Sequence, residues 1–104
     1  MEKWVDAADI GELKDGMCKA LPAKDGSEIA LFCIQKNFYA ISNACSHMGG
    51  PLSEGRVKGK IVTCPWHGWQ IDVTTGGFAI DPSAPAQKVY PTRITKSKVQ
   101  VRIA

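Results

Sequence analysis

Short hydrophobic runs separated by turn residues extend along most of the chain. The runs "EIALFCIQ" (28–35) and "FYAIS" (38–42) are rich in residues that favour β-strands. We predict that they form a hairpin with a tight turn at Lys36-Asn37. In "KVQVRI" (98–103) every second residue is apolar, which is typical of a strand with one buried face.

The remaining pattern also predicts strands and turns. "KIVT" (60–63) and "WQIDV" (69–73) are expected strands, and only residues 6–15 could hold a turn or so of helix. Asp72 and Thr74 are expected to satisfy backbone groups of a turn beside them. Ten glycines and six prolines spread along the chain fit the same picture. The predicted fold class is therefore all-β, a small antiparallel β-sandwich or barrel.

Length and composition limit the alternatives. The 104 residues are enough for one domain, and 44% hydrophobic with 22% charged residues is ordinary for a globular protein. No apolar run approaches the roughly 18 residues of a membrane span, so we expect no membrane contact. The acidic start "MEKWVDAADIGELKDG" lacks the apolar core of a signal peptide, which favours a cytoplasmic location. Thiols stay reduced there, so the four cysteines indicate metal binding or chemistry before disulfides.

The net charge of +3 is unevenly distributed. Residues 1–28 carry seven acids against four lysines, whereas residues 86–104 carry five basic residues and no acid. No aromatic and basic recognition motif accompanies this tail, so we expect no nucleic-acid partner. A solvated strand edge protected by its lysines is the favoured interpretation, and a docking face for an acidic protein is second.

Both histidines of the chain lie beside cysteines in matched order. Cys45-x-His47 is followed, after sixteen residues, by Cys64-x-x-His67, and both stretches fall between predicted strands, in loops. Thiolate and imidazole are ligands of zinc, copper and iron–sulfur sites. Four such residues in two matched pairs therefore predict a metal site.

The order of the ligands bears on the choice of metal. Zinc sites usually group the cysteines and then the histidines, commonly after a helix. Blue copper would use one cysteine and an axial methionine; Met48 is available, but the second cysteine argues against copper. A two-iron cluster explains the alternation, because each loop then supplies one ligand to each iron.

These residues resemble the Rieske proteins, whose C-x-H…C-x-x-H signature binds a [2Fe–2S] cluster. "CSHMGGPLSEG" and "CPWHGWQIDVTTG" are similar to the two cluster-binding boxes of that family, and the preceding hairpin and the final strands also fit. The resemblance implies a single Rieske domain over 1–104 with one cluster per chain. It also implies cluster-binding loops at about 43–52 and 62–70 that form a subdomain, and a proline-containing covering loop at about 80–87.

The resemblance implies roles for single residues. Cys45 and Cys64 would hold the inner, buried iron, and His47 and His67 would hold the outer iron near the surface. Three glycines would let the backbone approach the bridging sulfides: Gly49, Gly50 and Gly68.

Two cysteines outside the boxes and two tryptophans within the second box have other expected roles. Cys18 and Cys33 lie outside them and are expected only to pack as small hydrophobic residues. Trp69 is expected to pack as well. The sequence is compatible with three roles for Trp66: packing, shielding the cluster, or docking a partner.

Two departures from the quinol-oxidising members of the family indicate a low reduction potential. Those members carry an inter-loop disulfide where this chain has Gly50 and Trp66. They also carry hydroxyl donors to sulfur where this chain has Trp69 and Ile71. Fewer hydrogen bonds to the cluster stabilise the added electron less. The sequence is therefore similar to soluble, low-potential Rieske ferredoxins.

The resemblance implies a monomeric one-electron carrier that is not an enzyme by itself. Its expected partners are a flavin-dependent ferredoxin reductase and the terminal oxygenase of an aromatic-ring-hydroxylating dioxygenase system. One alternative is the Rieske-like small subunit of an assimilatory nitrite reductase. A more distant alternative is a zinc-binding interaction module.

Overall fold

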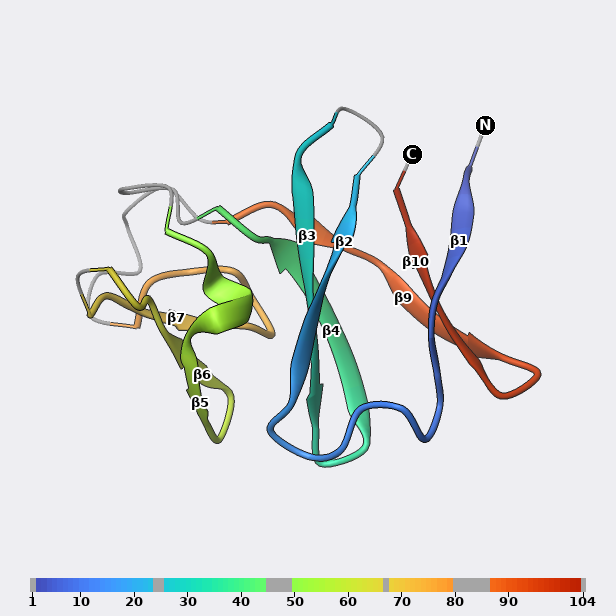
Figure 1. The fold of residues 1–104 in the computed structure, drawn as a ribbon, viewed down its shortest axis with the longest axis horizontal. Helices are drawn as coiled ribbons and strands as arrows, with labels where there is room; N and C mark the ends of the chain where they lie inside the picture. Colours follow the sequence, from blue (N-terminus) through green and yellow to red (C-terminus); the bar gives the residue numbers. More distant parts are fainter. Residues whose placement is uncertain (1, 24–25, 45–49, 67, 80–86, 104) are drawn as a thin grey trace.

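The computed structural model describes residues 2–23, 26–44, 50–66, 68–79 and 87–103. These residues form ten strands and one short 3₁₀ helix, and every strand pair is antiparallel, so the all-β expectation is confirmed (Figure 1). The elements are β1 (Trp4–Asp9), β2 (Cys18–Pro22), β3 (Glu28–Ile34), β4 (Asn37–Ser42), η1 (Leu52–Glu54), β5 (Arg56–Lys58), β6 (Ile61–Thr63), β7 (Gln70–Asp72), β8 (Val89–Tyr90), β9 (Thr92–Thr95) and β10 (Lys98–Arg102). No helix among them is long and apolar enough to cross a membrane.

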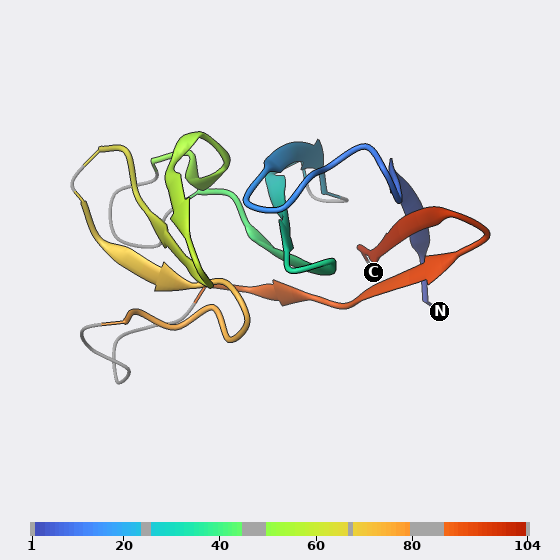
Figure 2. The ribbon, with the colours of Figure 1, turned by 90° about the horizontal axis from the view of Figure 1, so that it is seen from below.

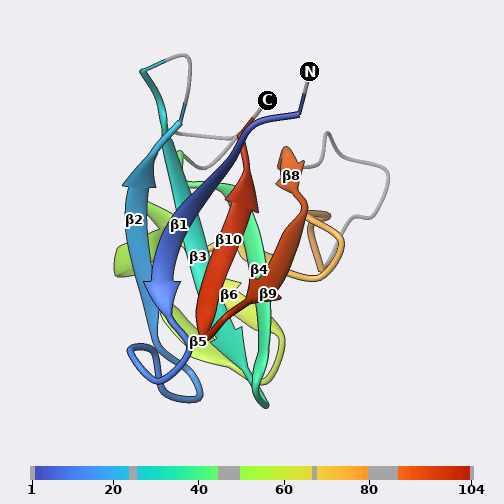
Figure 3. The same cartoon turned by 90° about the vertical axis from the view of Figure 1, so that its right-hand side faces the viewer.

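The strands form three sheets. The terminal sheet has the order β1-β10-β9, the central sheet β2-β3-β4-β8, and the small sheet β5-β6-β7. The central sheet stands between the other two, with the small sheet and η1 on one side (Figure 1). Seen from the right-hand side of Figure 1, the terminal sheet lies in front of the central one (Figure 3). The short β8 and the longer β9 follow one another and connect the two larger sheets (Figure 2).

Strand β3 is buried on both faces and separates two hydrophobic cores. Ile29, Leu31 and Cys33 pack with residues of the terminal sheet in the first core. The alternate residues pack with residues of the small sheet and η1 in the second core: Ala30, Phe32 and Ile34. Because side chains alternate across a strand, one apolar run can supply both cores. We call these the terminal core and the small-sheet core.

The hairpin turn lies one residue earlier than predicted. Ile34 pairs with Asn37, so the turn residues are Gln35 and Lys36, with φ of 50° and 68°. Both lie in the left-handed region, as in the two-residue turns whose twist matches a hairpin. The usual sequence signal for such a turn is Asn-Gly, and its absence here explains the misplacement. The Asp15 carboxylate supports the turn by accepting a hydrogen bond from Gln35 N at 2.6 Å.

The expected helical turn near the N-terminus is also wrong. The first residues of 6–15 belong to strand β1, and a hydrogen-bonded turn follows, in which Glu12 N donates to Asp9 O at 2.9 Å. Alternating contacts with β10 outweigh the local helical preference.

The interpretation of the basic tail as a strand edge is correct for β8 and β9, which are edge strands of their sheets, and wrong for β10. β10 lies between β1 and β9, at the centre of its sheet, as a strand whose apolar face enters the terminal core. Its cations pair with acids of the N-terminal segment: Lys98 with Asp9, and Arg102 with Glu2 at 3.0 Å. Part of the uneven charge of the sequence therefore serves pairing between the two ends of the chain.

Candidate metal centre

Of the four predicted ligands, the structure places Cys64. Cys45, His47 and His67 lie outside the described residues, as do Gly49 and most of the 80–87 segment. Cys64 directly follows the last residue of β6, and its side chain is 1% exposed within the small-sheet core. The expectation that this Cys/His stretch falls between two strands is confirmed, because β6 ends at Thr63 and β7 begins at Gln70.

Backbone hydrogen bonds close the loop that Cys64 begins. Cys64 N donates to Trp69 O at 2.8 Å, and Gly68 N donates to Cys64 O at 3.0 Å. Gly68 has a φ of 77°, a conformation that side chains rarely adopt. The sequence therefore turns sharply at the glycine and holds the cysteine at the base of a tight loop.

Gly50 lies against the thiol of Cys64. A Cβ atom at Gly50 would be 2.8 Å from Cys64 Sγ and 3.0 Å from Trp66 Cγ. Real Cβ atoms do not approach sulfur or ring carbon so closely, so only glycine fits without displacing the loop. The two Cys/His sequence boxes therefore contact each other at Gly50, whose backbone lies beside the buried sulfur of Cys64. A soft thiol in such surroundings fits the donor chemistry of an iron–sulfur cluster.

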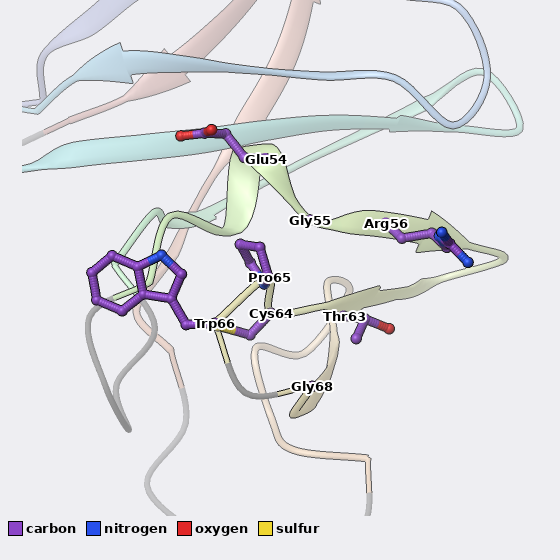
Figure 4. A pocket seen from close by; sticks show the side chains of 8 residues that line it. All are labelled: Glu54, Gly55, Arg56, Thr63, Cys64, Pro65, Trp66 and Gly68. Atoms are coloured by element: carbon purple, nitrogen blue, oxygen red, sulfur yellow. The ribbon is translucent and has the colours of Figure 1, made fainter.

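A surface pocket of about 690 Å³ opens beside Cys64 (Figure 4). It is lined by Glu54, Gly55, Arg56, Thr63, Cys64, Pro65, Trp66 and Gly68. Trp66 projects at one end of it and is 63% exposed, so this indole is not a core residue. Trp69 packs edge-on against Phe78 with ring centroids 4.9 Å apart, as expected, and the residue is still 37% exposed.

We call the two segments at the beginning and end of the first loop, 42–44 and 51–53, its neck. Two residues that hold the neck were not predicted from the sequence. Ala44 and Pro51 form an isolated antiparallel bridge on either side of residues 45–50. Asn43 and Gln87 are the buried polar residues among those the structure describes, and both bond to this neck. No local sequence signal marks either residue, since their importance comes from partners far away in the chain.

The turn after β7 behaves as predicted. Asp72 Oδ1 accepts hydrogen bonds from Thr74 N at 2.9 Å and Thr74 Oγ1 at 2.6 Å, and Lys60 Nζ lies 3.3 Å from Asp72 Oδ2. Burial raises the pKa of Asp72, but the hydrogen bonds from Thr74 and the contact with Lys60 outweigh burial, so that the net pKa is lowered.

The two cysteines outside the boxes pack as expected. Cys33 is buried in the terminal core. Cys18 packs against the small-sheet core and donates from Sγ to Ser53 O at 2.8 Å, and burial raises the pKa of its thiol. A raised pKa disfavours the reactive thiolate, so Cys18 is an anchor between β2 and η1.

Comparison with known proteins gives consistent matches over nearly the whole chain. A sequence profile of the family described as "Rieske [2Fe-2S] domain" matches residues 3–91. The ferredoxin component of the naphthalene 1,2-dioxygenase system from Pseudomonas aeruginosa is 31% identical over 103 residues, 99% of this chain and 98% of that protein.

Solved structures agree. A chain in the complex of reduced oxygenase and oxidized ferredoxin in carbazole 1,9a-dioxygenase matches with a TM-score of 0.87 at 25% identity. That match covers 93% of this chain and 99% of the other. A Mycobacterium tuberculosis protein described as an NADH-dependent nitrite reductase small subunit matches with a TM-score of 0.89 at 25% identity, over 100% and 97% of the two chains.

The chain belongs to the Rieske [2Fe–2S] domain family. It carries a Rieske-type [2Fe–2S] cluster, and it is an electron-transfer ferredoxin rather than an enzyme by itself. Family membership decides against the zinc module, and the expected Rieske fold is confirmed.

Proposed function

We propose that Cys45, His47, Cys64 and His67 hold the cluster, with the cysteines on the inner iron and the histidines on the outer iron. The support from the described residues is the buried thiol of Cys64 with the Gly50 backbone against it. When bound, the cluster supplies a reversible one-electron change. The small-sheet core excludes water from the Cys64 side of this site. We further propose that the loops at about 43–52, 62–70 and 80–87 surround the cluster within one domain.

We infer that this ferredoxin accepts an electron from a flavin-dependent reductase. It then delivers the electron to the terminal oxygenase of an aromatic-ring-hydroxylating dioxygenase system. The observation that carries this inference is the 31% identity, over nearly the full length of both chains, to a ferredoxin component of such a system. We propose that the protein acts as a monomer in the cytoplasm. The free thiols of Cys18 and Cys33 are compatible with a reducing compartment.

A low reduction potential is part of this proposal. Trp69 and Ile71 carry no hydroxyl group, and Ile71 is buried in the small-sheet core. Without hydroxyl donors to sulfur, the more negative reduced cluster is less stabilised. We therefore expect a midpoint near the low end of the range of roughly −150 to +300 mV. Protein-film voltammetry across pH measures it, and a midpoint well above zero at pH 7 would contradict a ferredoxin role.

Reconstitution tests the partners. The purified holoprotein is mixed with the reductase and terminal oxygenase of a naphthalene dioxygenase system, and substrate oxidation is followed with NADH as the electron source. Turnover should depend on this protein, and the Cys64→Ser variant should not support it. Reduction by the reductase without any transfer to the oxygenase would contradict the proposed delivery step.

The nitrite reductase alternative keeps one specific observation in its favour, the match over all of this chain to a nitrite reductase small subunit. Under that alternative, the protein should co-purify with an assimilatory nitrite reductase large subunit and support its NADH-dependent nitrite reduction. Parallel assays with both partner systems separate the two functions, because only one should gain activity.

A further inference from the structure

Gln87 lies at the junction of the central sheet and the loops of the metal centre. Its side chain is 4% exposed, and the residue directly precedes Lys88 and strand β8. Burial of an uncharged amide is costly unless its hydrogen bonds are made. The hydrogen-bond partners of this amide therefore indicate the role of the side chain.

The carboxamide nitrogen of Gln87 faces three acceptor oxygens at and just beyond the end of β4, and these share its two hydrogens. Gln87 Nε2 lies 2.9 Å from Ser42 O, 2.8 Å from Ser42 Oγ and 2.8 Å from Ala44 O. These contacts join positions more than forty residues apart in sequence. One side chain thus fixes the backbone on both sides of Asn43, immediately before Cys45.

The backbone of Gln87 is fixed as well, so the side chain has a rigid base. Gln87 N donates to Gly76 O at 2.7 Å. A Cβ atom at Gly76 would lie 2.5 Å from Gln87 O, so the two segments are in close contact. On the other side, Ser42 N donates to Lys88 O at 2.9 Å.

Asn43 holds the opposite side of the same neck. Its Oδ1 accepts from Ser53 N at 2.7 Å, and its backbone oxygen accepts from Leu52 N at 2.8 Å. The segment 42–44 is therefore fixed between Gln87 and the start of η1. A shift of this segment would move the first residue of the ligand box with it.

The chemistry of the contact requires a hydrogen-bond donor. Two of the three acceptors are backbone carbonyls, which can only accept, so the group facing them must donate. A methionine at this position keeps the volume but leaves these oxygens without the donor. A carboxylate adds repulsion, because its oxygens would face carbonyl oxygens.

We propose that Gln87 is a positioning residue for the metal centre, which sets the path of residues 42–44 and thereby the position of Cys45. This inference rests on the proposed assignment of Cys45 as a ligand. Gln87 acts on the metal centre through its hydrogen bonds to Ser42 and Ala44.

The test compares Gln87→Met and Gln87→Glu with Thr92→Val. Thr92 Oγ1 donates to Phe38 O at 2.8 Å, so the control also removes one partly buried side-chain hydrogen bond to the backbone, far from the neck. Three readouts apply to the holoprotein: amide hydrogen exchange, the rate of cluster loss to a chelator, and the electron paramagnetic resonance line width of the intact cluster.

We expect Gln87→Met to speed exchange at the Leu52 and Ser53 amides about tenfold while β3 amides stay unchanged. Cluster loss should accelerate by a similar factor, the resonance lines should broaden, and Gln87→Glu should exceed Gln87→Met in all three. Thr92→Val should leave all three readouts at their wild-type values.

Two outcomes would overturn the proposal. Faster neck exchange with an unchanged cluster would show that Gln87 is only structural, and equal effects of Gln87→Met and Thr92→Val would show the same. A Cys45→Ser variant with an unaltered Rieske spectrum would instead refute the ligand assignment, whatever the Gln87 variants do. The two failures are therefore distinguishable.

Discussion

The two cores on either side of β3 differ in how they are closed. The terminal core lies under strands of up to six residues, and ion pairs between β1 or its flanking residues and β10 tie the chain ends together. The small-sheet core lies under three strands of three residues each. Strands this short give the sheet few pairing bonds of its own, and its buried residues pack against those of β3.

This difference separates stability from function within one domain. The terminal half has longer paired strands and a continuous buried apolar core. It therefore serves as the stable support of the domain. The small-sheet half has short strands and long loops, and these loops carry the proposed ligands. Individual contacts hold the loops in place: Gly50 against Cys64, Cys18 against Ser53, and the hydrogen bonds of Asn43 and Gln87. The following predictions test whether the halves are as separate as this comparison implies.

The largest expected effect is that of Cys64→Ser. The hydroxyl is a harder and weaker ligand than thiolate, so the inner iron should not be held and the cluster should be absent. Iron and acid-labile sulfide analysis of the purified protein measures this. The terminal half should stay folded, as shown by retained exchange protection in β1 and β10. A normal Rieske spectrum in this variant would refute the ligand assignment.

Neighbouring residues of β3 offer a direct comparison of the cores. Leu31 and Phe32 are both fully buried, but Leu31 faces the terminal core and Phe32 the small-sheet core. Truncation of either to alanine should cost about 2–5 kcal/mol of unfolding free energy, measured by denaturant titration. Only Phe32→Ala should also speed cluster loss to a chelator. Equal acceleration by Leu31→Ala would show that the halves are coupled more tightly than we infer.

Gly50→Ala should have an intermediate effect on the cluster. The added methyl group would meet Cys64 Sγ at 2.8 Å and must displace the thiol or Trp66. We expect cluster occupancy to fall severalfold, with an altered absorption spectrum in the remainder. Gly11→Ala is the matched control, since nothing lies within 4 Å of its Cβ position. If Gly50→Ala carried a full, unaltered cluster, the close contact would not matter for cluster binding.

The smallest effect concerns pH and Asp72. Its folded pKa lies below the ordinary value of 3.8, so its stabilising contribution is present above that value. The contribution is lost as pH falls through the lowered folded pKa. Asp72→Asn should remove this part of the acid dependence and lower stability at neutral pH by about 1 kcal/mol or less. Acid unfolding curves of the two proteins compare it, and identical curves would contradict the role of Asp72.

Local features of the chain were sufficient to predict the class of fold and the chemistry of the site. Alternation in 98–103 and the apolar run 28–35 predicted strands, and both lie in strands of the structure. The two Cys/His pairs identified the family because ligand type and spacing are local properties of the chain. The roles expected of Asp72 and Trp69 were also local, since each depends on residues close by in sequence.

Features that depend on partners distant in sequence became visible only in the folded chain. It showed that β3 supplies two cores, that β10 is central, and that Asn43 and Gln87 hold the neck. The turn at Gln35-Lys36 was predicted one residue too late for the same reason. Strand register, rather than turn composition, places these two residues at positive φ. A buried polar residue is recognised only by the partners that satisfy it, and those of Gln87 lie more than forty residues away.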